Sequence, residues 1–139
     1  MNLERSCGAI VFTKQNGQFL FVIVQEQAGT YSFPKGHMEG AETEHETARR
    51  EIFEETGLQP EFLDGFCQQE EYELSEKPGT RKQVTYFLAE FQDTSLTARE
   101  GEIRQCLLVP YEGALTLIPH EDTRRILRAA YTFLTRSEQ

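Results

Sequence analysis

Apolar runs in the first third of the chain predict strands. "SCGAIVF" (6–12) and "QFLFVIVQE" (18–26) are rich in β-branched and aromatic residues, and the intervening "KQNG" is typical of a tight turn. "TYSF" (30–33) predicts a short extended piece that stops at Pro34, because the residue before a proline is disfavoured from helix. The glycine-containing stretch that follows predicts a loop.

The next element is a helix with signals at both of its ends. Thr43 and Glu46 have the spacing of a capping box, and Gly57 is a natural stop after a run of good helix formers. Ala48 and Ile52 lie four residues apart on one stripe of this helix. We therefore expect that stripe to pack on the sheet, with the acidic faces beside it.

The second half of the chain predicts further strands and a closing helix. The order of elements becomes β-β-(β)-α-β-β-β-α, which favours a mixed sheet packed between helices, an α/β (α+β) arrangement, over a strict βαβ repeat. No repeat or linker interrupts the sequence, so residues 1–139 are expected to form one domain. The segments are strands at 61–74, 82–91 and 105–110, a brief helical turn at "YEGAL", and an amphipathic helix at 120–134.

Composition narrows the classes of partner. The formal net charge of −9 argues against nucleic acid, because phosphate backbones require clustered lysine and arginine. No apolar run approaches the roughly 20 residues of a membrane span, and the N-terminus lacks the apolar region of a signal peptide, so a cytoplasmic protein is expected. Residues 39–55 contain seven glutamates, and the lysine and arginine residues of this segment are only Arg49 and Arg50. Such a segment attracts cations.

Three of these glutamates share one face of the predicted helix. Relative to Glu51, Glu54 lies about 60° to one side and Glu55 about 40° to the other, so the three occupy an arc of about 100°. Like charges at this spacing destabilise an isolated helix. Mg²⁺ and Mn²⁺ prefer oxygen ligands, and three carboxylates on a rigid face suit them. A solvated acidic face is the alternative.

The carboxylates belong to a longer motif. Gly36 is followed after five residues by Glu42, and after seven more by "REIFEETGL" (50–58). This spacing resembles the signature of the Nudix hydrolase family without a departure. The resemblance implies an α/β/α sandwich and the hydrolysis of a diphosphate linked to another group.

The resemblance also implies the role of each residue in the motif. Arg50 would orient the neighbouring carboxylates, and Glu42 would be an occasional further ligand. More than one Mg²⁺ or Mn²⁺ ion would bind and activate a water for attack on phosphorus. The implied metal ligands are the Gly36 carbonyl and the carboxylates of Glu51, Glu54 and Glu55.

One further carboxylate is a candidate from the last third of the chain. Many family members place a glutamate six residues before a tryptophan that is followed by Val-Pro. The corresponding segment here is "EIRQCLLVP", with Glu102 at the glutamate and Leu108 in place of the tryptophan. Glu102 is therefore the candidate for a further metal ligand or the water-activating base, and Glu100 is the alternative.

Other stretches resemble one group within the family. "FPKGH" before the signature, "CGAIVF" near the N-terminus, and "DGF" followed by "KQVTYFLAEF" are similar to asymmetrical diadenosine tetraphosphate hydrolases. This likeness covers residues 6 to about 92 and more loosely the closing helix. It implies a small-molecule substrate, a nucleotide or dinucleoside polyphosphate, cleaved in the latter case to ATP and AMP.

Candidate substrate contacts follow from the same stretches. Tyr86 matches an adenine-stacking tyrosine of those hydrolases, and strand alternation predicts that it faces a groove while Phe87 faces the core. Phe133 is a candidate for the opposing ring. The candidates for phosphate binding are Lys35 and His37, which flank Gly36, and the basic group of Lys77, Arg81 and Lys82.

Other substrates and a different class of protein remain open. A (deoxy)nucleoside triphosphate, a diphosphoinositol polyphosphate or the 5′-triphosphate end of RNA would suit the same motif. A Nudix-fold module that senses a nucleotide without cleaving it is the non-enzyme alternative, although every carboxylate of the motif is present. A monomer and a dimer are equally compatible with the sequence.

Overall fold

The computed structural model describes residues 2–92, 96–98 and 102–138. Its centre is a mixed sheet in which β1 (Asn2–Gln15) runs parallel to β7 (Thr80–Glu90) and antiparallel to β2 (Gln18–Glu26). The path of the sheet is β3-β2-β1-β7-β5, with β4 paired to β1, β6 to β7 and β8 to β2. The remaining strands are β3 (Tyr31–Ser32), β4 (Lys35–His37), β5 (Glu61–Phe62), β6 (Gln68–Glu73) and β8 (Ile103–Pro110).

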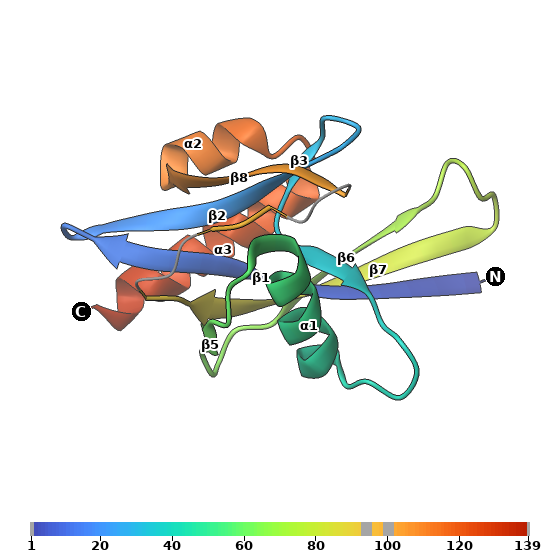
Figure 1. Ribbon diagram of the computed structural model, residues 1–139. Coiled ribbons are helices and arrows are strands. Elements are labelled where there is room, and N and C mark those ends of the chain that lie inside the picture. The colour runs from blue at the N-terminus through green and yellow to red at the C-terminus, as the bar shows by residue number, and fades with distance from the viewer. Residues whose placement is uncertain (1, 93–95, 99–101, 139) are drawn as a thin grey trace.

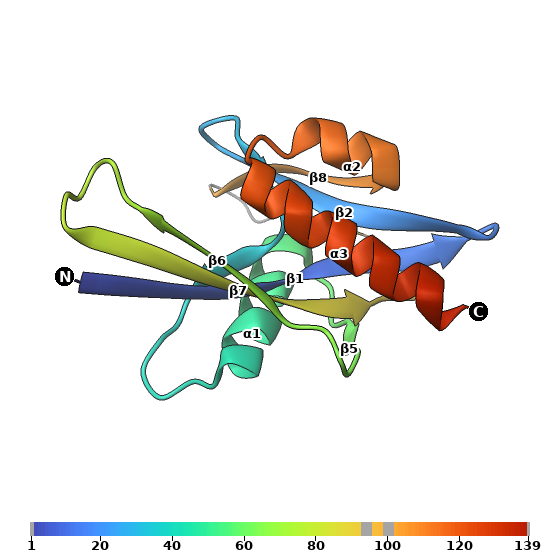
Figure 2. The ribbon, with the colours of Figure 1, turned by 180° about the vertical axis from the view of Figure 1, so that it is seen from behind.

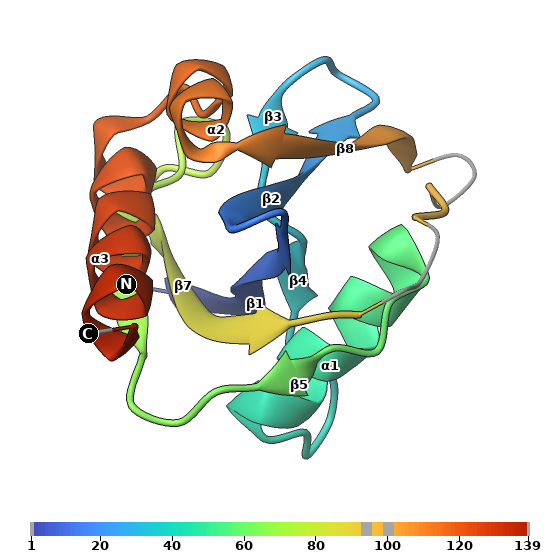
Figure 3. The ribbon, with the colours of Figure 1, turned by 90° about the vertical axis from the view of Figure 1, so that its left-hand side faces the viewer.

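Helices cover both faces of this sheet. α1 (Glu44–Thr56) lies on one side, and α2 (Tyr111–Leu117) and α3 (Glu121–Ser137) lie on the other, which is clearest in the end-on view of Figure 3. In Figure 1, α3 lies behind the sheet, and Figure 2 shows from the other side that it runs across this face. The predicted mixed sheet between helices is therefore confirmed.

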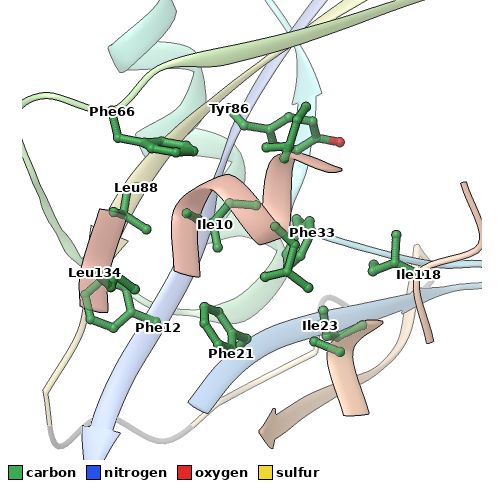
Figure 4. Packing of buried hydrophobic residues seen from close by; sticks show 14 of the residues in the cluster. Ile10, Phe12, Phe21, Ile23, Phe33, Phe66, Tyr86, Leu88, Ile118 and Leu134 are labelled. Atoms are coloured by element: carbon green, nitrogen blue, oxygen red, sulfur yellow. The ribbon is translucent and has the colours of Figure 1, made fainter. Parts of the chain in front are cut away.

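The sheet separates two apolar clusters. The larger cluster lies between the sheet and α3 and contains Ile10, Phe21, Tyr86 and Leu127 (Figure 4 shows many of its members). The smaller lies under α1, where Ala48 and Ile52 are completely buried, as the helical stripe predicts. β1 and β7 contribute side chains to both clusters, because successive side chains of a strand point to opposite faces.

The boundaries of α1 are those that the sequence predicts. The Thr43 hydroxyl accepts from the Glu46 N–H at 3.1 Å, and the Thr43 N–H donates to the Glu46 carboxylate at 2.8 Å. Gly57 ends the helix with φ +77°, a left-handed conformation that costs glycine little. Within the described residues, no helix is long and apolar enough to cross a membrane.

Two predictions about strands need correction. The predicted loop after Pro34 contains β4, a short strand that pairs with Ser6–Gly8 of β1. The predicted strand at 61–74 is divided into β5 and β6, and Gly65 between them has φ +96°. Local composition missed both features because pairing with β1 and β7 decides them.

Candidate active site

The centre of the candidate site is the close approach of α1 to β4. A Cβ atom placed on Gly36 would lie 2.1 Å from both Cδ and Oε2 of Glu51, far inside van der Waals contact. Only glycine at this position lets the Glu51 carboxylate rest on the β4 backbone. Gly36 is fixed there because it pairs with Cys7 in β1.

Arg50 organises the carboxylates around this point. Its Nε donates to Glu42 Oε2 at 2.7 Å, and its Nη1 donates to Glu51 Oε1 at 2.8 Å and Glu54 Oε2 at 3.3 Å. Its Nη2 donates to the His37 carbonyl at 2.8 Å, which ties β4 to the helix. The hydrogen bond from Arg50 lowers the pKa of Glu42 to about 2. The orienting role predicted for Arg50 is in keeping with these contacts.

Glu55 sits in a different environment from Glu42. Its side chain is buried, and the Lys35 N–H donates to its Oε1 at 3.3 Å. Burial, and next the neighbouring charge of Glu51, raise the pKa of Glu55 to about 8. A carboxyl that is hard to ionise beside a second buried carboxylate is a place where an added cation would relieve repulsion.

The donor chemistry fits a hard divalent cation. Carboxylate oxygens and a glycine carbonyl are the ligands that Mg²⁺ and Mn²⁺ prefer, and the glycine keeps the space beside Glu51 free of a side chain. Across the described residues, however, no three acidic, histidine or cysteine side chains are already arranged to hold an ion. Arg50 holds Glu51 and Glu54 toward itself, so the carboxylates would have to rotate to bind a cation.

A pocket of about 810 Å³ adjoins this cluster. β3, β4, β6 and the start of α3 form its walls, and Lys35 connects it to the carboxylates, because it lines the pocket and contacts Glu55. Lys82 lines the same pocket, where burial, and next the charge of Lys35, lower its pKa. The lining also contains six carboxylates, so a phosphate ligand that reaches the two lysines would need a divalent cation to offset the acidic charge around it.

The structure corrects the exposure expected for the Tyr86 ring. Its ring is 0% exposed and packs edge-on against Phe33 in the larger core cluster (Figure 4), although it also borders the pocket. Phe87 is likewise buried, on the opposite face, where it stacks on His45. The two side chains do point to opposite faces of the sheet, but α3 covers the face that carries Tyr86. Tyr86 therefore presents no free ring face to a base.

Phe133 is also not placed as an opposing ring for Tyr86. It lies on the C-terminal half of α3, packs against Phe66 with ring centres 5.9 Å apart, and lines a separate pocket of about 580 Å³. The N-terminus of α3 borders the larger pocket. Phe133 lies toward the other end of the same helix, so its side chain is far from that pocket.

The remaining cationic candidates divide between the pocket and the surface. Lys35 and Lys82 line the pocket, whereas Arg81 forms an ion pair with Glu71 at 3.5 Å on the neighbouring strand. His37 is exposed, and its Nε2 lies 4.0 Å from Glu4 Oε1. Lys77 donates to the same Glu4 at 2.9 Å.

Glu102 lies exposed directly before β8. The Cys106 thiol donates to the Glu55 carbonyl at 3.4 Å, so β8 runs beside the end of α1 that carries the carboxylates. The role of Glu102 as a base or a further ligand stays a prediction. Glu100, the alternative, lies outside the described residues.

Tyr72 is a pocket residue that the sequence did not predict. Tyr72 of β6 is 39% exposed, lines the pocket and pairs across the strands with Lys82. Its position opposite Lys82 is set by the register between β6 and β7, which alternation within one strand does not specify. Unlike the Tyr86 ring, the Tyr72 ring has exposed surface that is available for stacking.

The chain is similar to known proteins in sequence and in fold. The family description "NUDIX domain" matches residues 3–130. The chain is 31% identical to bis(5′-nucleosyl)-tetraphosphatase [asymmetrical] of Sus scrofa and 30% identical to that of Mus musculus, covering 94% of this chain and 95% of each relative. The fold is similar to that of a C. elegans Ap4A hydrolase binary complex, with a TM-score of 0.87 at 23% identity, covering 95% of this chain and 98% of that one.

Replacing Gly36 by alanine should weaken metal binding while leaving the fold intact. The added Cβ meets the far end of the flexible Glu51 side chain, which can move away at small cost, but the carboxylate then leaves β4. Mn²⁺ affinity, measured by electron paramagnetic resonance, should fall about tenfold or more, equivalent to roughly 1.4 kcal/mol. Gly113→Ala on α2 is the matched control, because its Cβ would meet nothing closer than 3.5 Å. Unchanged Mn²⁺ affinity in Gly36→Ala would contradict the placement.

The metal-free protein should lose stability as pH rises from about 4.5 to 8. Over this window the unfolded Glu55 loses its proton, while burial and Glu51 keep the pKa of the folded carboxyl at about 8. Folding then favours the protonated form, and the free energy of unfolding falls with a maximum slope of roughly 1.4 kcal/mol per pH unit. Glu55→Gln should flatten this slope in denaturant titrations with a chelator present. An equally steep slope in the variant would assign the effect to other groups.

Proposed function

This chain belongs to the Nudix hydrolase family, and we propose that it cleaves diadenosine tetraphosphate to ATP and AMP in a divalent-metal-dependent reaction. As a member of the family it is a hydrolase of phosphoric anhydride bonds. The observation that carries the finer proposal is the juxtaposition of the Arg50-centred carboxylates with a pocket that holds two lysines and an accessible tyrosine. The likeness to relatives named for this activity supports the same substrate.

The carboxylates of the site would have different roles in metal binding. Glu51, Glu54 and Glu55, with the Gly36 carbonyl, would hold Mg²⁺ or Mn²⁺, and Arg50 would keep the first two in place between turnovers. A bound divalent cation supplies charge neutralisation for the polyphosphate and a water of lowered pKa. Glu42, tied to Arg50 by two hydrogen bonds, would hold that arginine in position.

The pocket would receive one nucleoside and the phosphates next to it. Lys35 and Lys82 would contact phosphate oxygens, because they approach the pocket from two strands of the same sheet. Tyr72 would stack on the base. The sequence predicted this role for Tyr86, whose ring is buried. Lys35 adjoins Glu55 through its own backbone, so the phosphate chain would pass from the lysines directly to the metal ligands.

Product analysis tests the proposal. Purified protein is incubated with Mg²⁺ or Mn²⁺ and a panel of dinucleoside polyphosphates, nucleoside triphosphates and nucleotide sugars, and products are separated chromatographically. We expect diadenosine tetraphosphate to give equal amounts of ATP and AMP, and we expect Glu54→Gln to retain less than a tenth of the rate. Preferred cleavage of a nucleoside triphosphate, or two ADP molecules as products, would contradict the substrate assignment. Binding without turnover would favour the sensor class.

Glu102→Gln should lower kcat by about 10²-fold or more if Glu102 activates the water, in line with general-base contributions. Its exposed position directly before β8 leaves little packing to lose, so the melting temperature should stay unchanged. Glu100→Gln is the comparison variant. A large loss in Glu100→Gln with wild-type rates in Glu102→Gln would move the base by two residues.

Tyr72→Ala should raise KM for diadenosine tetraphosphate about 5- to 150-fold, because stacking a base on an aromatic face is worth roughly 1–3 kcal/mol. The value of kcat should change little, since stacking stabilises the bound substrate and the transition state alike. Tyr111→Ala, outside both pockets, serves as the control for aromatic removal. A fall in kcat with KM unchanged would show that Tyr72 is not a base platform.

A further inference from the structure

The larger pocket has a buried carboxylate in its wall that the proposed hydrolysis does not use. Glu70 of β6 lines the pocket and is only 8% exposed. The Tyr86 hydroxyl donates to its Oε1 at 3.0 Å, and Thr123 Oγ1 lies 3.0 Å from Oε1 and 2.9 Å from Oε2. These contacts fix the plane of the carboxylate from β7 on one side and from α3 on the other.

The hydrogen-bonding capacity of Glu70 is only partly used by these partners. A hydroxyl carries one proton, so Thr123 and Tyr86 together supply two donated protons, whereas a carboxylate can accept about four. Each carboxylate oxygen therefore keeps accepting capacity. Glu70 and Tyr72 are two residues apart on the same face of β6 and both line the pocket, so a ligand there would lie close to this carboxylate.

The neighbours of Glu70 define how a nucleoside would meet it. Lys82 lies across the strands from Tyr72, so a cationic and an aromatic side chain lie side by side in the wall of the pocket. Glu70 lies about 6–7 Å further along β6, which is two residues of an extended strand. A base stacked on Tyr72, with its phosphates toward Lys82, would direct its outer edge toward Glu70.

We propose that Glu70 determines base specificity in this pocket and selects guanine by accepting its N1–H and N2–H donors together. Guanine presents two adjacent N–H groups, which match the two oxygens of a carboxylate. Adenine presents one amino donor next to the N1 acceptor, whose lone pair faces the second oxygen unfavourably. This inference rests on the proposed function only in taking a nucleotide as the occupant, and it favours guanosine-containing dinucleoside tetraphosphates over diadenosine tetraphosphate.

Direct binding without turnover provides the test. GMP and AMP are titrated into the metal-free protein by calorimetry, and we expect GMP to bind about tenfold tighter or more, the range of two hydrogen bonds to a charged group. Glu70→Gln should abolish this preference by weakening GMP at least about tenfold and AMP less than about threefold. The wild-type comparison needs no variant, so the proposal stays testable even if Glu70→Gln unfolds.

Two control variants separate recognition from support of the fold. Thr123→Val removes one partner of Glu70 but keeps the carboxylate, so the preference for GMP should remain. Glu61→Gln on β5, outside both pockets, makes the same chemical change and should leave both affinities unchanged. Equal loss of GMP and AMP in Glu70→Gln would overturn the proposal, because it would point to the ribose hydroxyls or to a structural role.

Failure of the guanine preference can be distinguished from failure of the proposed hydrolase function. Hydrolysis of diadenosine tetraphosphate with no difference between GMP and AMP would overturn the role of Glu70 and leave the hydrolase assignment standing. Preferential GMP binding with no cleavage of any dinucleoside tetraphosphate would do the reverse. With both correct, KM for diguanosine tetraphosphate should be lower than that for diadenosine tetraphosphate, and Glu70→Gln should remove the difference at nearly constant kcat.

Discussion

The contacts of the Arg50 guanidinium hold the candidate site together. Like charges on one helix face repel each other, and Glu51, Glu54 and Glu42 all converge on this one cation. The same group reaches the His37 carbonyl and so fastens β4 to α1. Arginine suits this position because its planar group offers five donors in a fixed fork, which a lysine ammonium cannot match.

Gly36 is the second constraint on the site. It leaves room beside β4 for the Glu51 carboxylate, which Arg50 also contacts. With no side chain on β4 at this point, the Glu51 carboxylate rests against the strand, and Glu55 lies close to Lys35 one residue away. Lys35 in turn borders the pocket. A chain of direct contacts therefore runs from the helix carboxylates through β4 to the larger pocket, and this connection places the proposed reaction centre beside the proposed binding site.

Features set by local chemistry were predictable from the sequence, and features set by packing were not. The cap at Thr43, the stop at Gly57 and the buried stripe of Ala48 and Ile52 depend on residues close in sequence. The burial of Tyr86 depends on α3, which is 35 or more residues later and covers one face of the sheet. Alternation alone cannot reveal which face a distant helix will occupy, and so Tyr72 and Glu70 became visible as pocket residues only in the folded chain.

Anomalous X-ray diffraction from crystals soaked in Mn²⁺ tests the central claim most directly, because it locates the ion without reference to activity. The account predicts a peak between Gly36 and α1, within coordination distance of the Gly36 carbonyl and of carboxylate oxygens of Glu51 and Glu55, with Glu54 rotated away from Arg50. Ordered Mn²⁺ elsewhere in the molecule, with Glu51 and Glu54 still bound to Arg50, would contradict it.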